Sequence, residues 1–147
     1  MTESYKNLNQ SAEYWNDFKA SDEEKILADF ENSATKFMLV ALFEDRIVGG
    51  LGFWNYPGEF VKQSASLGMS IQKEFSGSGL GTEMMNYMLD QAKRIGIHRI
   101  DLTVRTYNEA GIKLYEKVGF ERIGLLKEMA FIDGQYVDEY SYQKILR

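Results

Sequence analysis

Hydrophobic residues recur with two different spacings in the first half of the chain. Apolar residues return at steps of three and four between residues 11 and 30, which predicts helical structure. Two apolar runs follow, at residues 36–43 and 46–54, and Glu44 and Asp45 separate them. These runs predict a β-hairpin. After a loop near residues 55–59, polar and apolar positions alternate from residue 66 to residue 72, which predicts a further strand.

The second half alternates helical and extended patterns. Gly96 is placed to end its first helix. The apolar residues of that helix share one face, and they are Leu80, Met84, Met85, Met88, Leu89 and Ala92. The pattern then predicts a strand at residues 99–104, a helix at 108–117 that Gly119 ends, and two strands near 120–129 and 136–146. A turn at Asp133 and Gly134 joins these last strands. This order predicts an α+β fold with helices on a mostly antiparallel sheet.

Composition narrows the class of protein. A chain of 147 residues that is 44% hydrophobic, with no repeat or linker, suits a single domain over residues 1–147. The absence of cysteine excludes a cysteine nucleophile and thiolate metal ligands, and the single histidine, His98, is interpreted as structural, so no metal site is predicted. No apolar run long enough to cross a membrane and no signal peptide are apparent, which predicts a cytoplasmic protein without membrane contact. The net charge of -5 argues against nucleic acid as a partner.

A glycine-rich segment between a strand and a helix, residues 75–82, is the most informative local feature. Gly77, Gly79 and Gly81 let the backbone turn sharply and approach a ligand closely. The helix that follows leaves its first amides unpaired and carries a partial positive charge, which suits a phosphate or diphosphate. The P-loop pattern does not fit, because Gly81 is followed by Thr82 and Glu83 and not by Lys and Ser or Thr. The dinucleotide fingerprint G-x-G-x-x-G does not fit either, because its last glycine would fall at Thr82 or at Met84. A tight turn that binds nothing is the alternative.

Two motifs together resemble the GNAT N-acetyltransferases. Residues 76–81 are similar to the coenzyme A-binding pattern Gln/Arg-x-x-Gly-x-Gly/Ala of that family, and residues 108–120 to its second signature, Asn-x-x-Ala-x-x-Leu-Tyr-x-Lys-x-Gly-Phe. Residues 131–138 are similar to the branch of spermidine, ribosomal-protein and phosphinothricin acetyltransferases. The resemblance covers residues 36–147; the first 35 residues show no convincing first strand, which the fold normally has. Ser76 replaces the usual Gln or Arg, so one side-chain contact to the diphosphate is expected to be lost.

The resemblance implies the acyl-coenzyme A N-acyltransferase fold, acetyl-coenzyme A as cosubstrate and Tyr115 as the general acid. Backbone groups of residues 69–71 would pair with the pantetheine arm, Asn108 would hydrogen-bond it, and Lys117 would approach a phosphate. Relatives are often dimers, so a homodimer is a further expectation. The implied cofactor-binding residues are Met69, Ser70, Ile71, Ser76, Gly77, Ser78, Gly79, Leu80, Gly81, Thr82, Asn108 and Lys117.

The resemblance identifies neither the acceptor nor the general base. The expected acceptor is a small amine, an amino acid, a polyamine or a peptide N-terminus, which attacks acetyl-coenzyme A directly in a ternary complex. Most amines are protonated at pH 7, so the site must remove a proton. Glu59 is the first candidate base, and Asp138 or Glu139 the second, although each is also explained as a solvated surface carboxylate. A non-catalytic acyl-coenzyme A sensor and a nucleotide-binding domain are the alternative functions.

Overall fold

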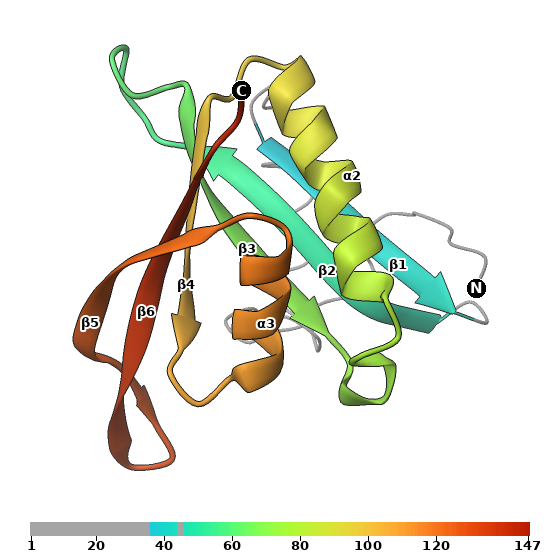
Figure 1. Cartoon of the computed structure of the whole chain (residues 1–147), viewed down its shortest axis with the longest axis vertical. Coiled ribbons are helices and arrows are strands. Elements are labelled where there is room, and N and C mark those ends of the chain that lie inside the picture. The colour runs from blue at the N-terminus through green and yellow to red at the C-terminus, as the bar shows by residue number, and fades with distance from the viewer. Residues whose placement is uncertain (1–35, 44–45) are drawn as a thin grey trace.

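The computed structural model describes residues 36–43 and 46–147. The described strands form one six-stranded sheet in the order β1-β2-β3-β4-β6-β5, and only β3 and β4 run parallel (Figure 1). The predicted hairpins and the mostly antiparallel sheet are therefore confirmed, whereas the predicted helical residues 11–30 and the question of a first strand lie outside the described residues. The strands are β1 (Lys36–Phe43), β2 (Arg46–Asn55), β3 (Ser64–Ile71), β4 (Arg99–Arg105), β5 (Glu121–Ile132) and β6 (Gln135–Ile145).

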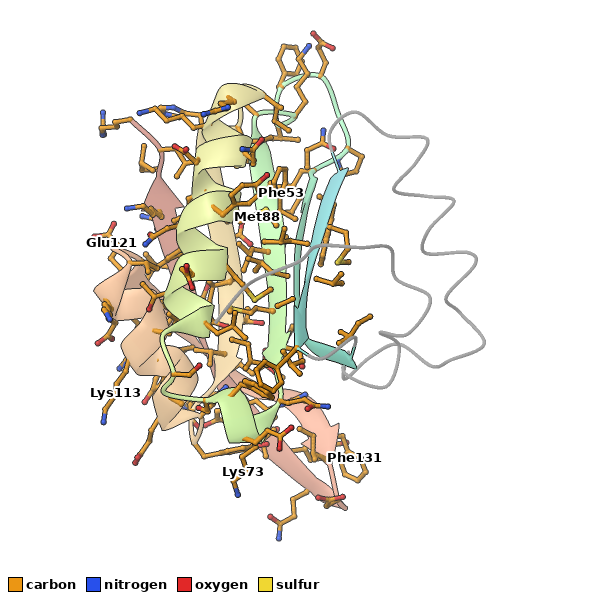
Figure 2. The ribbon with its side chains drawn as sticks, turned by 90° about the vertical axis from the view of Figure 1, so that its right-hand side faces the viewer. Phe53, Lys73, Met88, Lys113, Glu121 and Phe131 are labelled. Carbon is orange, nitrogen blue, oxygen red and sulfur yellow. The ribbon has the colours of Figure 1, made fainter. Side chains whose placement is uncertain are left out.

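Two α-helices of the described part, α2 (Leu80–Arg94) and α3 (Glu109–Lys117), cover the same face of the sheet. Figure 2 shows both on one side of the strands. The methionines of α2 are buried in the core beneath it, together with Phe53 of β2 and Tyr142 of β6. Met84 and Met88 are 0% exposed, so they are packing residues, as their position on the apolar face predicts. No helix of the described residues is long and apolar enough to cross a membrane.

The boundaries of β3 differ from the predicted ones. The strand begins at Ser64 and ends at Ile71, so the preceding loop extends to residue 63. Two backbone amides, those of His98 and Arg99, donate to the carbonyl oxygen of Gln63 at 2.8 and 3.3 Å. This contact starts the parallel pairing with β4 before the alternating pattern begins, and pairing rather than side-chain polarity therefore sets the strand boundary.

Strands β3 and β4 separate after a short paired stretch. Only residues 64–66 of β3 pair with β4, where they oppose residues 99–101. Beyond that point β3 stays paired with β2 as far as Ile71, and β4 stays paired with β6 as far as Arg105. Figure 1 shows the two strands diverging toward their carboxyl ends. The facing edges of both strands consequently carry backbone groups that have no partner in the sheet.

A polar cluster anchors α3 to the two C-terminal strands. The hydroxyl of Tyr142 donates to Glu116 Oε2 at 2.7 Å and accepts from Arg122 Nε at 3.1 Å. The guanidinium of Arg122 in turn lies 3.7 Å from the ring centroid of Tyr140. This cluster therefore ties the Glu116 side of α3 to the two C-terminal strands, in addition to the packing of Tyr115 in the core.

Gly119, just after α3, provides a test of the local fold. Its φ is 98°, a conformation that costs a residue with a Cβ about 1–2 kcal/mol. A Cβ there would meet the flexible end of Lys144, which can move, so the backbone conformation dominates the cost. We expect Gly119→Ala to lower the free energy of unfolding by about 1–2 kcal/mol in urea denaturation.

The matched control is Gly124→Ala in β5, because Gly124 lacks a positive φ and a Cβ there would meet nothing within 4 Å. An equal loss of stability in both variants would contradict the assignment of the cost to the left-handed conformation of Gly119.

Candidate active site

A cavity of about 690 Å³ opens where β3 leaves β4. Its walls come from the carboxyl end of β3, the short 3₁₀ helix η3 (Lys73–Phe75) with the glycine segment after it, the amino end of α2, and α3. Figure 1 shows α2 and α3 over the sheet, and the glycine segment between the carboxyl end of β3 and the amino end of α2. The described residues that line the cavity are Met69, Ser70, Ile71, Phe75, Ser76, Gly77, Gly79, Gly81, Thr82, Asn108, Glu109, Ala110, Gly111, Lys113, Leu114, Tyr115 and Lys117.

The glycine segment presents backbone amides to this cavity. Gly77 and Gly79 have φ values of 78° and 92°, which turn the chain into α2 without a side-chain cap at the helix start. The amides of Ser78 and Leu80 have partners within the segment, at 3.4 Å each. Those of Gly77, Gly79, Gly81 and Thr82 form no hydrogen bond with any described residue. Four unpaired amides at the positive end of a helix form a site for an anion.

Gly81 brings α2 against the other two walls of the cavity. A Cβ at this position would lie 2.9 Å from Leu114 Cδ2 of α3 and 3.0 Å from Ile71 Cδ1 of β3. Because both contacts involve side chains that line the cavity, a larger residue would move its floor. The absence of a side chain thus keeps the amides within reach of a ligand lying in the cavity.

Tyr115 of α3 lines the cavity and is only 8% exposed. Its ring packs on Phe120 and Tyr142, with centroids 6.2 and 6.4 Å away. Burial raises the pKa of the Tyr115 phenol from 10.0 to about 12, since a phenolate would be poorly solvated there. The phenol is therefore uncharged throughout the neutral range, and its O–H is able to donate a hydrogen bond.

Asn108 serves the fold and the cavity together. Its Oδ1 accepts the amide of Gly111 at 3.0 Å and so caps the amino end of α3. Because this contact uses the oxygen, the Nδ2 group remains as a donor, and Asn108 lines the cavity.

Most of the predicted cofactor-binding residues lie together in the cavity wall, but two do not. Ser78 donates through its hydroxyl to the carbonyl oxygen of Phe75 at 2.6 Å, and Leu80 is 1% exposed in the core. Six further lining residues were not predicted from the sequence, although the four-residue spacing of Glu109, Lys113 and Lys117, which places them on one face of a helix, could have indicated two of the six. These six are Phe75, Glu109, Ala110, Gly111, Lys113 and Leu114.

The three candidate bases occupy different places. Glu59 lies in the loop before β3, at the end of that strand away from the cavity, and its 75% exposed side chain pairs with Lys62 at 3.1 Å. Asp138 of β6 accepts the amide of Glu128 through Oδ1 at 2.7 Å. Glu139, also of β6, is opposite Arg105 at the carboxyl end of β4, beside the separated strands.

Glu139 and Arg105 form a loose ion pair on the face of the sheet away from α2 and α3. Strand alternation places them there, because Val104 and Tyr140, their neighbours in sequence, pack in or against the core. The distance from Arg105 Nε to Glu139 Oε2 is 3.9 Å, and the carboxylate side chain is 13% exposed. Arg105 Nε is buried and has no hydrogen-bond partner among the described residues. The pair therefore keeps unused hydrogen-bonding capacity near the gap between β3 and β4.

The separated strands, the glycine segment and the two helices define the acyl-coenzyme A N-acyltransferase fold. The model of the Acetyltransferase (GNAT) family matches residues 3–120, and the chain belongs to that family. It is 30% identical over 108 residues to the L-amino acid N-acetyltransferase AaaT of Escherichia coli, covering 73% of this chain and 67% of that protein. The class of enzyme predicted from the sequence, an N-acetyltransferase, is thus confirmed.

Further relatives support the predicted branch. The chain is 33% identical over 110 residues to the [ribosomal protein uS5]-alanine N-acetyltransferase of Escherichia coli, with 74% of this chain and 56% of that protein covered. The matches therefore span between about half and two thirds of these relatives' own length. Among solved structures, an acetyltransferase of the GNAT family from Streptococcus pneumoniae superposes with a TM-score of 0.84 at 23% identity, covering 99% of both chains.

A putative acetyltransferase from Salmonella typhimurium, yncA, was solved with its cofactor acetyl-coenzyme A, the cosubstrate expected from the sequence. It superposes with a TM-score of 0.82 at 20% identity and covers 99% of this chain and 94% of that one.

The raised pKa of Tyr115 makes stability depend on alkaline pH. Below pH 10 the phenol is neutral in the folded and the unfolded chain. Between pH 10 and about 12 it ionises mainly in the unfolded chain, so the free energy of unfolding falls as pH rises. At pH 11 this loss is about 1.4 kcal/mol. We expect Tyr115→Phe to lose less stability than the unaltered protein between pH 8 and pH 11 in urea denaturation.

The control is Tyr107→Phe, because Tyr107 is 60% exposed. The prediction fails if the Tyr115 variant follows the same pH dependence as the unaltered protein.

Proposed function

We propose that the protein transfers acetyl from acetyl-coenzyme A to a primary amine by direct attack in a ternary complex. The observation that carries the proposal is the convergence of four unpaired amides, an unpaired strand edge and a buried phenol on one cavity. Diphosphate, pantetheine arm and thioester are the three chemical parts of the cosubstrate that these groups would bind.

The cosubstrate would lie across the cavity from the glycine segment toward the gap between β3 and β4. The amides of Gly77, Gly79, Gly81 and Thr82 would hold the diphosphate. Residues 69–71 of β3, unpaired on the side of β4, would pair with the amides and carbonyls of the pantetheine arm as a neighbouring strand does. Asn108 Nδ2 would donate to the same arm. One amide of β3 would also polarise the thioester carbonyl as an oxyanion donor.

Tyr115 would assist departure of the thiolate chiefly by a hydrogen bond. The thiol has a pKa near 8.5, whereas the phenol has a pKa of about 12. This difference of about 3.5 opposes complete proton transfer by about 5 kcal/mol. A hydrogen bond from the phenol that strengthens as negative charge builds on sulfur still lowers the barrier. The sulfur takes up a proton at the stage when the nitrogen of the new amide loses one.

The chemistry of the acceptor favours an α-amino group. An α-amine, with a pKa near 8, is neutral in about one molecule in ten at pH 7, whereas a lysine-like amine is neutral in about one in a few thousand. A carboxylate of ordinary basicity removes a proton far more readily from the former. The two relatives named above act, by their names, on an L-amino acid and on an alanine of a ribosomal protein. We therefore favour the α-amine of an amino acid or a peptide N-terminus.

Glu139 is the best placed of the three candidate bases. The arm would approach the gap from the helix face, so the amine would approach the thioester from the opposite face, where Glu139 lies. Glu59 lies at the distant end of β3, and the carboxylate of Asp138 already accepts a backbone amide. We propose that Glu139 accepts the proton of the amine, directly or through water.

Tyr115→Phe tests the role of the phenol. We expect kcat to fall about 100-fold, because a donor to the leaving sulfur is lost, while KM for acetyl-coenzyme A changes less than about threefold. Release of free thiol from acetyl-coenzyme A across a panel of amines measures both constants. Unchanged kcat in the variant would remove Tyr115 from the reaction. A protein that binds the cofactor but releases no thiol with any amine would instead be an acyl-coenzyme A sensor.

Glu139→Gln tests the base. We expect kcat/KM to fall about 100-fold at pH 7 with an α-amine, and the loss to shrink toward high pH, where the amine is neutral without assistance. The pH profile of kcat/KM is the measurement, and Asp90→Asn on the exposed side of α2 is the control. A larger loss in Glu59→Gln or Asp138→Asn than in Glu139→Gln would move the base to that residue.

A further inference from the structure

The charged side chains that line the cavity all belong to one helix. In the described part of the wall they are Glu109, Lys113 and Lys117, four residues apart on α3. Residues at this spacing share one face of a helix and rise by about 6 Å at each step. The cavity therefore has a charged margin along α3, across from the glycine segment.

The charges of this margin differ in how they are compensated. Glu109 lies in the first turn of α3, where the helix dipole stabilises a carboxylate. Lys113 and Lys117 form no ion pair within the part of the chain that the structure describes. Figure 2 shows Lys113 extending outward from α3. In a chain with a net charge of -5, two adjacent free cations at the margin of a cavity favour an anion there.

The diphosphate of the proposed cosubstrate does not account for these lysines, because the amides of the opposite wall would hold it. Coenzyme A has one further anionic group, the phosphate monoester on the 3′ oxygen of its ribose. A monoester carries a charge of about -1.5 to -2 at pH 7, which matches two ammonium groups. We propose that Lys113 and Lys117 bind this 3′-phosphate and so select coenzyme A over its 3′-dephospho form. The inference rests on the proposed function.

The test is a thermodynamic cycle between two lysines and one phosphate. Calorimetry would measure the binding of acetyl-coenzyme A and of acetyl-3′-dephospho-coenzyme A to the unaltered protein, Lys113→Gln, Lys117→Gln and the double variant. We expect the unaltered protein to bind the 3′-phosphorylated form at least tenfold more tightly in low salt, and the double variant to lose this preference. Binding of the dephospho form should change less than twofold, because it lacks the group that the lysines contact.

The control variant is Lys127→Gln, because Lys127 is an exposed lysine of β5 outside the cavity wall. This variant should keep the preference for the 3′-phosphorylated form. In the unaltered protein the same preference should decrease in high salt, because salt screens the attraction between the lysines and the phosphate. Equal binding of the two forms by the unaltered protein, or equal weakening of both in the double variant, would overturn the inference alone. Failure of both forms to bind would overturn the proposed function as well.

Discussion

The separation of β3 from β4 is the constraint on which the rest of the site depends. Two parallel strands that pair at residues 64–66 and then diverge leave polar backbone groups facing each other across a gap. Such groups are costly to bury without partners, so the gap has to be filled by water or by a ligand that offers amides of its own. A pantetheine arm has such amides.

Because no ladder connects the diverging ends of β3 and β4, other contacts must hold the gap open. On one side, Gly81 lets α2 pack closely on Ile71 of β3 and Leu114 of α3. On the other, the hydrogen bonds of Tyr142 fix Glu116, and hence α3, to β6. The cavity is thus held by packing at its floor, through residues that also line it, and by the polar contacts of Glu116 and Tyr142 at its outer wall.

Local patterns predict much of this structure, whereas the contacts between distant segments are not visible in them. The amphipathic face of α2, the start of α3 near Asn108 and the glycines of the turn follow from spacing and residue type. The start of β3 at Ser64 does not, because it depends on a carbonyl of Gln63 that meets two amides some 35 residues later. The place of Lys113 in the cavity wall was also missed, since an exposed helical lysine is usually only solvated. Its significance appears once the amides of Gly77 to Thr82 are seen on the opposite wall.

The buried phenol and the exposed lysines illustrate two ways in which one short helix can serve a ligand. Tyr115 is desolvated, which raises its pKa to about 12, so in the proposed reaction its proton would stay in place until charge builds on the leaving sulfur. Lys113 and Lys117 are exposed, so their charges are available to a phosphate but screened by salt. Exposure suits a group that binds the mobile end of a cofactor, and burial suits one that acts on the reacting end. Helix α3 could provide both, because Tyr115 faces the core while the lysines lie along the margin of the same cavity.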